Sequence, residues 1–305
     1  MSNTSAIPVE CYPCIFDQLL SLTKITGLGR ENGKILFEDS MRYLLETRGE
    51  GIVVQHVIRN ATDRAIALSL QGDDYDPYAK IKQRSNDIAL EFAEEFRATI
   101  QNASEPLQEA LKIAAAGNII DFGAKQHGSL DVEKELRTID ERVFGQFDFE
   151  AFSNRLNSAE RLLYICDNAG EIVFDKLCIE EIRRQYPEVD ITCAVRQRPV
   201  INDAVMLDAQ YAGLDEVARV VSSGSIYPGT LLDETSDEFR QLFTETDLII
   251  SKGQGNFETL LDISDERLFF ILRIKCDQMA KLSHVLKGDL VLMQGGKRGT
   301  AQPDG

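Results

Sequence analysis

The stretch that decides the fold is Leu162-Leu163-Tyr164-Ile165-Cys166-Asp167-Asn168-Ala169-Gly170-Glu171. It reads as a short apolar strand that ends in an acid, an amide, two small residues and a second acid. A helical pattern follows at once, with one face formed largely by Ile172, Val173, Leu177, Ile179 and Ile182. Strands buried on both faces are apolar along their length, so the polar cluster marks the point where the strand reaches the surface. Ligands bind at this carboxyl edge in open α/β sheets, and a ligand site is therefore expected here.

Asp167 and Asn168 carry the first functional prediction. Their oxygen atoms are expected to project into a crevice, and the backbone amides of Ala169 and Gly170 are expected to face the same space. The alternative is that Asp167 or Asn168 only caps the following helix, because both residue types are favoured at that position. A single cap would explain one of the two polar residues and would leave the other without a role.

The charge balance limits the classes of partner. The 305 residues include 33 Lys+Arg and 50 Asp+Glu, which gives a formal net charge of -17. Nucleic acids and anionic membranes would be repelled by a protein of this sign, so neither is an expected partner. A small phosphorylated ligand stays compatible, because a local cation or metal ion can hold it. The oligomeric state has no signal in the sequence.

The N-terminal residues and the cysteines indicate the compartment. No apolar run approaches the ~20 residues that span a bilayer. Residues 1–10 lack the basic flank and apolar core of a signal peptide, and the six cysteines do not form a dense disulfide framework. We therefore expect a cytoplasmic protein.

Hydrophobic periodicity divides the chain into two halves. Residues from 11 to about 150 read as helical throughout. From there on, apolar runs of strand length alternate with segments long enough for a helix, at 161–166, 189–195, 217–221, 247–250, 268–273 and 289–293. This alternation is typical of βαβ units and a mainly parallel sheet. We expect a helical cap or bundle domain over residues 1–150 and an α/β metal- and phosphate-binding domain over residues 151–305.

Polar clusters follow three of these expected strands. They are Asp167 to Glu171, then Arg196-Gln197-Arg198-Pro199 with Asn202-Asp203, and Ser251-Lys252-Gly253-Gln254-Gly255-Asn256-Phe257-Glu258. Parallel strands would bring all three clusters to one edge of the sheet. The convergence is a stronger argument for a site than any single cluster.

The residue types indicate what this site would hold. Asp167, Asn168 and Asp203 offer hard oxygen donors, which suit Mg²⁺ or Mn²⁺. Lys252 supplies the compact positive charge that a phosphate ligand needs. Gly253 would let the backbone approach an anion closely, although a tight strand-to-helix turn explains the glycine equally well.

Other residues in this half allow two interpretations, and the absence of known motifs argues against several classes of site. Arg196 and Arg198 would be either phosphate contacts or solvated charges. The first expected strand is not followed by Gly-x-Gly-x-x-Gly, which weakens a dinucleotide-binding interpretation. Neither a Gly-x-Ser-x-Gly elbow nor a Gly-x-x-x-x-Gly-Lys-Ser/Thr loop occurs in the chain.

With these residues in view, the chain resembles the metal-dependent damage-control phosphatases, also labelled ARMT-like. The resemblance rests on the three clusters above and on motifs in the helical half, which are Asp76-Pro77-Tyr78, Ala116-Gly117-Asn118-Ile119-Ile120-Asp121-Phe122-Gly123 and Cys11-Tyr12-Pro13-Cys14. The paired cysteines are similar to those of one mostly prokaryotic subfamily.

The resemblance implies a helical domain over a Rossmann-like three-layer α/β/α domain and hydrolysis of small phosphorylated metabolites. These would be sugar phosphates or damaged nucleotides and cofactors, and the metal would be Mg, Mn, Co or Ni. It implies metal ligation by Asp167, Asn168 and Asp203, with Asp167, Asp203 and Lys252 as catalytic residues. Substrate binding is expected at Asn118, Asp121, Ala169, Gly170, Glu171, Arg198, Gly253, Gln254 and Glu258.

Two other functions stay open on the sequence alone. A non-catalytic sugar-phosphate or nucleotide sensor would use the same pocket. A carboxyl methyltransferase that uses S-adenosylmethionine ranks lower, because a glycine-rich cofactor loop is missing. Cys11 and Cys14 would be half of a zinc site, a redox pair or a packed helix start.

Overall fold

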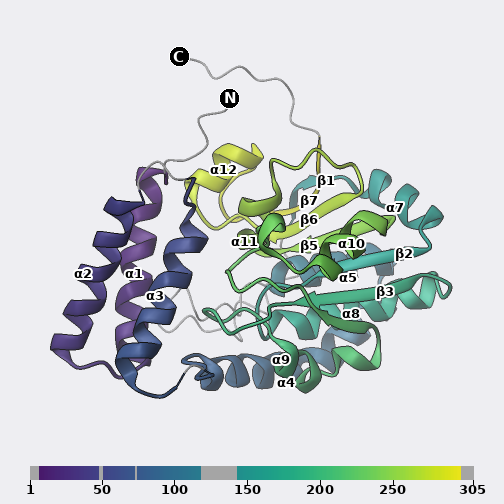
Figure 1. Cartoon of the computed structure of the whole chain (residues 1–305). Helices are drawn as coiled ribbons and strands as arrows, with labels where there is room; N and C mark the ends of the chain where they lie inside the picture. The colour runs from purple at the N-terminus through teal and green to yellow at the C-terminus, as the bar shows by residue number, and fades with distance from the viewer. Residues whose placement is uncertain (1–6, 48–50, 73, 118–142, 297–305) are drawn as a thin grey trace, which may run out of the picture.

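The computed structural model describes residues 7–47, 51–72, 74–117 and 143–296. The first half is helical, as predicted, up to residue 117. Its elements are η1 (Val9–Cys11), α1 (Tyr12–Ile25), α2 (Arg30–Glu46), α3 (Val54–Ser69), α4 (Ala79–Asn102) and α5 (Pro106–Ala116). The helices α1, α2 and α3 lie side by side at one end of the molecule, while α4 runs beneath the α/β part (Figure 1). Within the described ranges, no helix has both the length and the apolar character needed to cross a membrane.

The second half is built on one seven-stranded sheet in the order β1-β7-β6-β5-β2-β3-β4. The strands are β1 (Phe144–Phe147), β2 (Arg161–Ile165), β3 (Asp190–Val195), β4 (Arg219–Ser222), β5 (Leu248–Lys252), β6 (Leu268–Arg273) and β7 (Leu290–Gln294). All neighbours pair in parallel except β6 and β7, which are antiparallel. The predicted mainly parallel sheet is confirmed.

The expectation of helix throughout residues 11 to about 150 is wrong at β1. This short edge strand pairs with β7 from the far end of the chain, so its partner lies outside any local sequence window.

Helices cover both faces of the sheet, which confirms the three-layer arrangement. They are α7 (Phe149–Ser158), α8 (Glu171–Gln185), α9 (Met206–Tyr211), α10 (Asp237–Glu245), α11 (Gly253–Leu260) and α12 (Asp277–Ser283), with single 3₁₀ turns η4 (Leu214–Glu216) and η5 (Leu232–Glu234). Alternate residues of β2 belong to opposite cores. Leu162 and Tyr164 pack with α4, α5 and α8, whereas Leu163 and Ile165 pack with α10 and α11. This two-sided burial explains the continuous apolar runs of the sequence.

The helices of the first half divide between two places. α4 and α5 pack on α8 and share its core with the sheet. α1, α2 and α3 have two smaller cores of their own, into which Val200 and Ile201 of the α/β part insert. The division of the chain at residues 150 and 151 stays a prediction, and the shared core shows how closely α4 and α5 are joined to the sheet. We call α1, α2 and α3 the cap helices below.

Candidate active site

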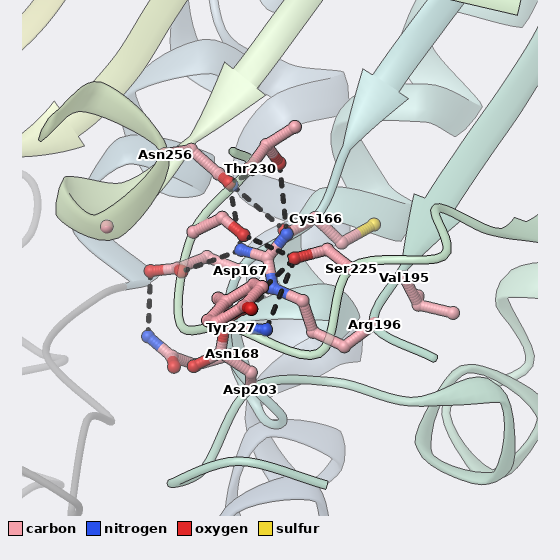
Figure 2. Close-up of polar contacts among 12 residues, drawn as sticks. Cys166, Asp167, Asn168, Val195, Arg196, Asp203, Ser225, Tyr227, Thr230 and Asn256 are labelled. Carbon is pink, nitrogen blue, oxygen red and sulfur yellow. Dashed lines mark hydrogen bonds and ion pairs between the residues drawn. The ribbon is translucent and has the colours of Figure 1, made fainter. Parts of the chain in front are cut away.

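The loops after β2 and β3 meet at the carboxyl edge of the sheet. Asn168 and Asp203 form an isolated antiparallel bridge. The backbone N–H of Ala204 donates to the carbonyl oxygen of Asp167 at 2.8 Å. The side chains of Asp167, Asn168 and Asp203 are all buried. Two of the predicted clusters therefore converge, and Asp203 lies on the same side of the sheet as Asp167 (Figure 2).

Arg196 forms the centre of the polar contacts between these loops. Its Nε donates to Asp203 Oδ2 at 2.7 Å, and its Nη2 lies 4.0 Å from Asp167 Oδ1. The side chain is 1% exposed, so it is not the solvated charge that one sequence interpretation allowed. Arg196 holds the two carboxylates, a role that the sequence did not indicate. The one available signal was its place directly after a buried strand.

Asn256 on α11 ties the third cluster to the other two (Figure 2). Its Oδ1 accepts from Arg196 Nη2 at 2.8 Å, and its Nδ2 donates to the carbonyl oxygens of Cys166 and Lys252 at 3.1 and 2.7 Å. The amide thus joins the carboxyl ends of β2 and β5. A buried polar network with every member bonded keeps such a site rigid.

Lys252 lies at the end of β5 and is 1% exposed. Its Nζ is 2.6 Å from Asp175 Oδ1 and 3.5 Å from Glu171 Oε2, and Tyr164 donates its hydroxyl to the same Asp175 oxygen at 2.8 Å. Burial lowers the pKa of Lys252, but the negative charges of Asp175 and Glu171 outweigh burial and raise it. The ammonium is therefore fixed and charged. Asp175 and Tyr164 were not singled out from the sequence.

The acidic residues near Lys252 form a connected group. Asn168 Nδ2 donates to Asp167 Oδ2 at 2.9 Å and to Glu171 Oε1 at 2.8 Å. Burial raises the pKa of Asp167 well above its ordinary value, and the charges of Glu171 and Asp203 raise it further. The site thus gathers four buried acidic side chains, those of Asp167, Glu171, Asp175 and Asp203, against the three cations Arg196, Lys252 and Lys275.

This charge excess and the donor set fit a hard divalent cation. Carboxylate and amide oxygens of Asp167, Asn168 and Asp203 are the donors that Mg²⁺ or Mn²⁺ prefers. In the part of the chain that the structure describes, no group of three His, Cys, Asp or Glu side chains is placed to hold a metal ion. A metal here would therefore rest on two carboxylates, the Asn168 amide and water.

The expectation for the amides of Ala169 and Gly170 is wrong in this structure. Ala169 N–H donates to the carbonyl oxygen of Asn202 at 2.9 Å, and Gly170 N–H donates to Asn86 Oδ1 at 2.6 Å. Both donors are used to hold the loop after β2 against its neighbours. Asn86 comes from α4, so sequence spacing did not reveal it.

Glu258 lies at the cap side of the site. Its Oε2 accepts from Gln55 Nε2 of α3, and its Oε1 accepts from Gln254 Nε2, both at 2.8 Å. Burial raises the pKa of Glu258, although the hydrogen bonds from Gln254 and Gln55 act against it. Gln55 is thus a helical residue that reaches the site and that the sequence did not single out.

The remaining predicted residues are placed less centrally or not described. Arg198 is 43% exposed, and its Nη2 lies 3.7 Å from Asp63 Oδ1. Asn118 and Asp121 lie outside the described residues. Cys11 and Cys14 are free thiols whose pKa values burial raises, to about 11 for Cys11. The zinc-site, redox-pair and helix-start interpretations of these two cysteines all stay open predictions.

The comparisons with known proteins identify the family and the fold of this α/β protein. Residues 7–291 match the family model described as the damage-control phosphatase ARMT1-like domain. The chain therefore belongs to the ARMT1-like damage-control phosphatase family.

Two curated relatives in the family carry the name damage-control phosphatase. The one from Pyrococcus horikoshii is 37% identical over 224 residues, which cover 73% of this chain and 76% of that protein. The one from Archaeoglobus fulgidus is 34% identical, with 71% and 75% covered. An uncharacterized protein of Methanocaldococcus jannaschii is 33% identical over 306 residues, with 94% and 95% covered.

A solved structure shows the same fold. The crystal structure of a DUF89 family protein from Pyrococcus horikoshii has a TM-score of 0.80 and 29% sequence identity to this chain. The match covers 95% of this chain and 99% of that one.

Proposed function

We propose that the protein is a metal-dependent phosphatase that hydrolyses small phosphorylated metabolites. The observation that carries the proposal is the meeting of Asp167, Asn168 and Asp203 around Arg196, with the ammonium of Lys252 close by. The names of the two archaeal relatives support the reaction class. Sugar phosphates, damaged nucleotides and damaged cofactors are the substrate classes to test.

Each polar group has a distinct task in the proposed reaction. A divalent ion bound by Asp167, Asn168 and Asp203 would polarise the phosphoryl group and acidify water. Lys252 offsets negative charge on the phosphoryl oxygens, and its contact with Asp175 holds the ammonium before substrate arrives. Asp167 either attacks phosphorus or orients an attacking water. Both roles need the ionised carboxylate, which a bound cation would favour against the burial that raises the pKa of Asp167.

The cap side of the site would bind the rest of the substrate. Glu258, Gln254 and Gln55 form a chain of hydrogen bonds between α11 and α3. Such groups suit hydroxyls on a sugar or ribose. Arg198, which is partly exposed beside Asp63, would contact a second anionic group of the substrate.

Phosphate release from a metabolite panel tests the proposal. The panel contains sugar phosphates, nucleotides and phosphorylated cofactors, each with Mn²⁺, Co²⁺, Ni²⁺ or Mg²⁺ and with EDTA. Release that depends on the metal is expected from the wild type. Binding without release would favour the sensor, and saturable S-adenosylmethionine binding in a calorimeter would favour the methyltransferase.

The variant Asp203→Asn tests whether Asp203 is needed for turnover. It should lower metal-dependent turnover by about 100-fold, because a misplaced metal or phosphoryl group loses its reactive geometry. Asp190→Asn removes the same charge from an exposed position at the amino end of β3 and should leave turnover unchanged. Circular dichroism checks that both variants fold. Unchanged turnover in a folded Asp203→Asn protein contradicts the proposed site.

A further inference from the structure

The loop that carries Asp203 is held from the cap by Arg59. We define residues 199–203 as the Asp203 loop. Arg59 lies on α3 and is buried. Its Nη1 donates to the carbonyl oxygen of Pro199 at 2.9 Å and to that of Ile226 at 3.4 Å. One guanidinium therefore joins the loop after β3 and the loop after β4 to the same cap helix.

Asp63 fixes the orientation of this guanidinium. It lies one turn further along α3 and accepts from both Nε and Nη2 of Arg59, with Nε at 2.8 Å from Oδ2. Such a two-point pair sets the plane of an arginine side chain, which a lysine would not reproduce. The remaining nitrogen, Nη1, is thereby aimed at the two loops.

Apolar packing holds the Asp203 loop at the same place. Val200 is 1% exposed and belongs to a cluster with Val57 and Ile58 of α3. Ile201 packs against both cap cores and has φ +46°. Such a backbone conformation is strained for a β-branched residue, so it persists only where the surroundings impose it.

The opposite side of the loop contacts the end of β2. The carbonyl oxygen of Asn202 accepts from Ala169 N–H at 2.9 Å, and Asp203 pairs with Asn168 in the isolated bridge. The Asp203 loop is thus held between α3 and the residues that would ligate the metal. A shift of the loop would move Asp203 relative to Asp167.

We propose that Arg59 is a positioning residue, which holds the Asp203 loop through the Pro199 carbonyl so that Asp203 lies beside Asp167 and Asn168 for a divalent cation. The proposal rests on the proposed metal-dependent function. It extends that function by making the docking of α3 a requirement for the metal site.

Electrostatics and positioning predict opposite effects when Arg59 is removed. Loss of a positive charge near an acidic site would strengthen the binding of a cation. Loss of a positioning contact would weaken it, and the removal of an outer-shell partner costs about 10- to 100-fold in metal affinity. The direction of the change therefore separates the two explanations.

Arg59→Met and Arg64→Met form a matched pair for the test. Arg64 lies on the same helix and forms an ion pair with Asp39 of α2, in which Arg64 Nε lies 2.7 Å from Asp39 Oδ2. Calorimetric titration with Mn²⁺ should show about tenfold weaker binding for Arg59→Met, and affinity close to that of the wild type for Arg64→Met. Thermal unfolding by circular dichroism shows whether each variant is folded.

Hydrogen–deuterium exchange of the metal-free proteins gives a readout that does not need activity. Amides of residues 199–205 should exchange faster in Arg59→Met than in Arg64→Met. Wild-type affinity, tighter binding or unchanged exchange in Arg59→Met would overturn the role of Arg59. A wild-type protein that binds no Mn²⁺ would instead overturn the metal site itself.

Discussion

Gly253 lies directly against the carboxylate of Asp167. A Cβ atom at position 253 would be 1.8 Å from Asp167 Oδ2 and 2.2 Å from its Cγ, and the residue has φ +80°. Only glycine meets both conditions without displacement of Asp167. Gly253 was expected to let the backbone approach a bound anion. In this structure the group beside it is the carboxylate of Asp167, a predicted metal ligand.

Gly253→Ala should therefore lower metal-dependent phosphate release by about 100-fold, because the new methyl group displaces Asp167. Gly27→Ala is the control. Gly27 has φ +67° and open space where a Cβ atom would lie. Alanine at position 27 would therefore be strained by the positive φ in the same way, but it would not clash with a neighbour. Equal losses of turnover in the two folded variants would contradict the explanation.

Removal of Arg196 should destabilise the protein strongly. Arg196→Met leaves Asp203 buried without the cation that lies 2.7 Å away, and a broken buried pair costs about 3–5 kcal/mol. Urea unfolding followed by circular dichroism measures the loss. The exposed pair of Arg161 with Glu245 gives the comparison, because Arg161→Met should cost about 0–1 kcal/mol. A similar small loss for Arg196→Met would show that the network tolerates an unpaired carboxylate.

Divalent metal should stabilise the wild type and not the variant that lacks a ligand charge. A ligand at about 100 times its Kd adds about 2.7 kcal/mol to the free energy of unfolding. Mn²⁺ should therefore raise the Tm of the wild type, and EDTA should reverse the rise. Asp203→Asn should show little change between the two conditions. A similar rise in both proteins would place the metal elsewhere.

Much of the fold was readable from the sequence because strands buried on both faces leave continuous apolar runs. β2, β3 and β5 follow that rule, and the polar residues after them identified the carboxyl edge of the sheet. β1 did not, since it is a short strand at the edge of the sheet, where it pairs with β7.

The sequence predicted only those site residues that belong to local motifs. Asp167, Asp203 and Lys252 follow strands directly, so parallel topology predicts their convergence. Gln55 and Asn86 come from helices far away in the sequence, and their roles depend on how α3 and α4 dock. Arg196 was noted in the sequence, but its burial among Asp203, Thr230 and Asn256 depends on two loops and on helix α11. No spacing rule encodes such contacts.

Glu234 forms a further contact between α3 and the α/β part, and this contact is exposed. Its Oε1 lies 2.7 Å from His56 Nε2, and Tyr227 donates its hydroxyl to Oε2 at 2.5 Å. Val53 N–H donates to His56 Nδ1 at 3.2 Å, which leaves Nε2 as the ring nitrogen that donates to Glu234. Burial raises the pKa of Glu234, but the hydrogen bonds from Tyr227 and His56 outweigh burial and lower it.

A lowered carboxyl pKa gives stability that is present above the unfolded value of about 4.5 and is lost as the pH falls through the lower folded value. Glu234→Gln should therefore reduce the free energy of unfolding at pH 7, by less than about 1 kcal/mol because the side chain is partly exposed. The difference between the two proteins should disappear at a pH well below the folded pKa. Urea unfolding at several pH values measures it by circular dichroism, since the chain has no Trp for fluorescence. A difference that stays constant down to acid pH would mean that the charge of Glu234 does not hold α3 in place.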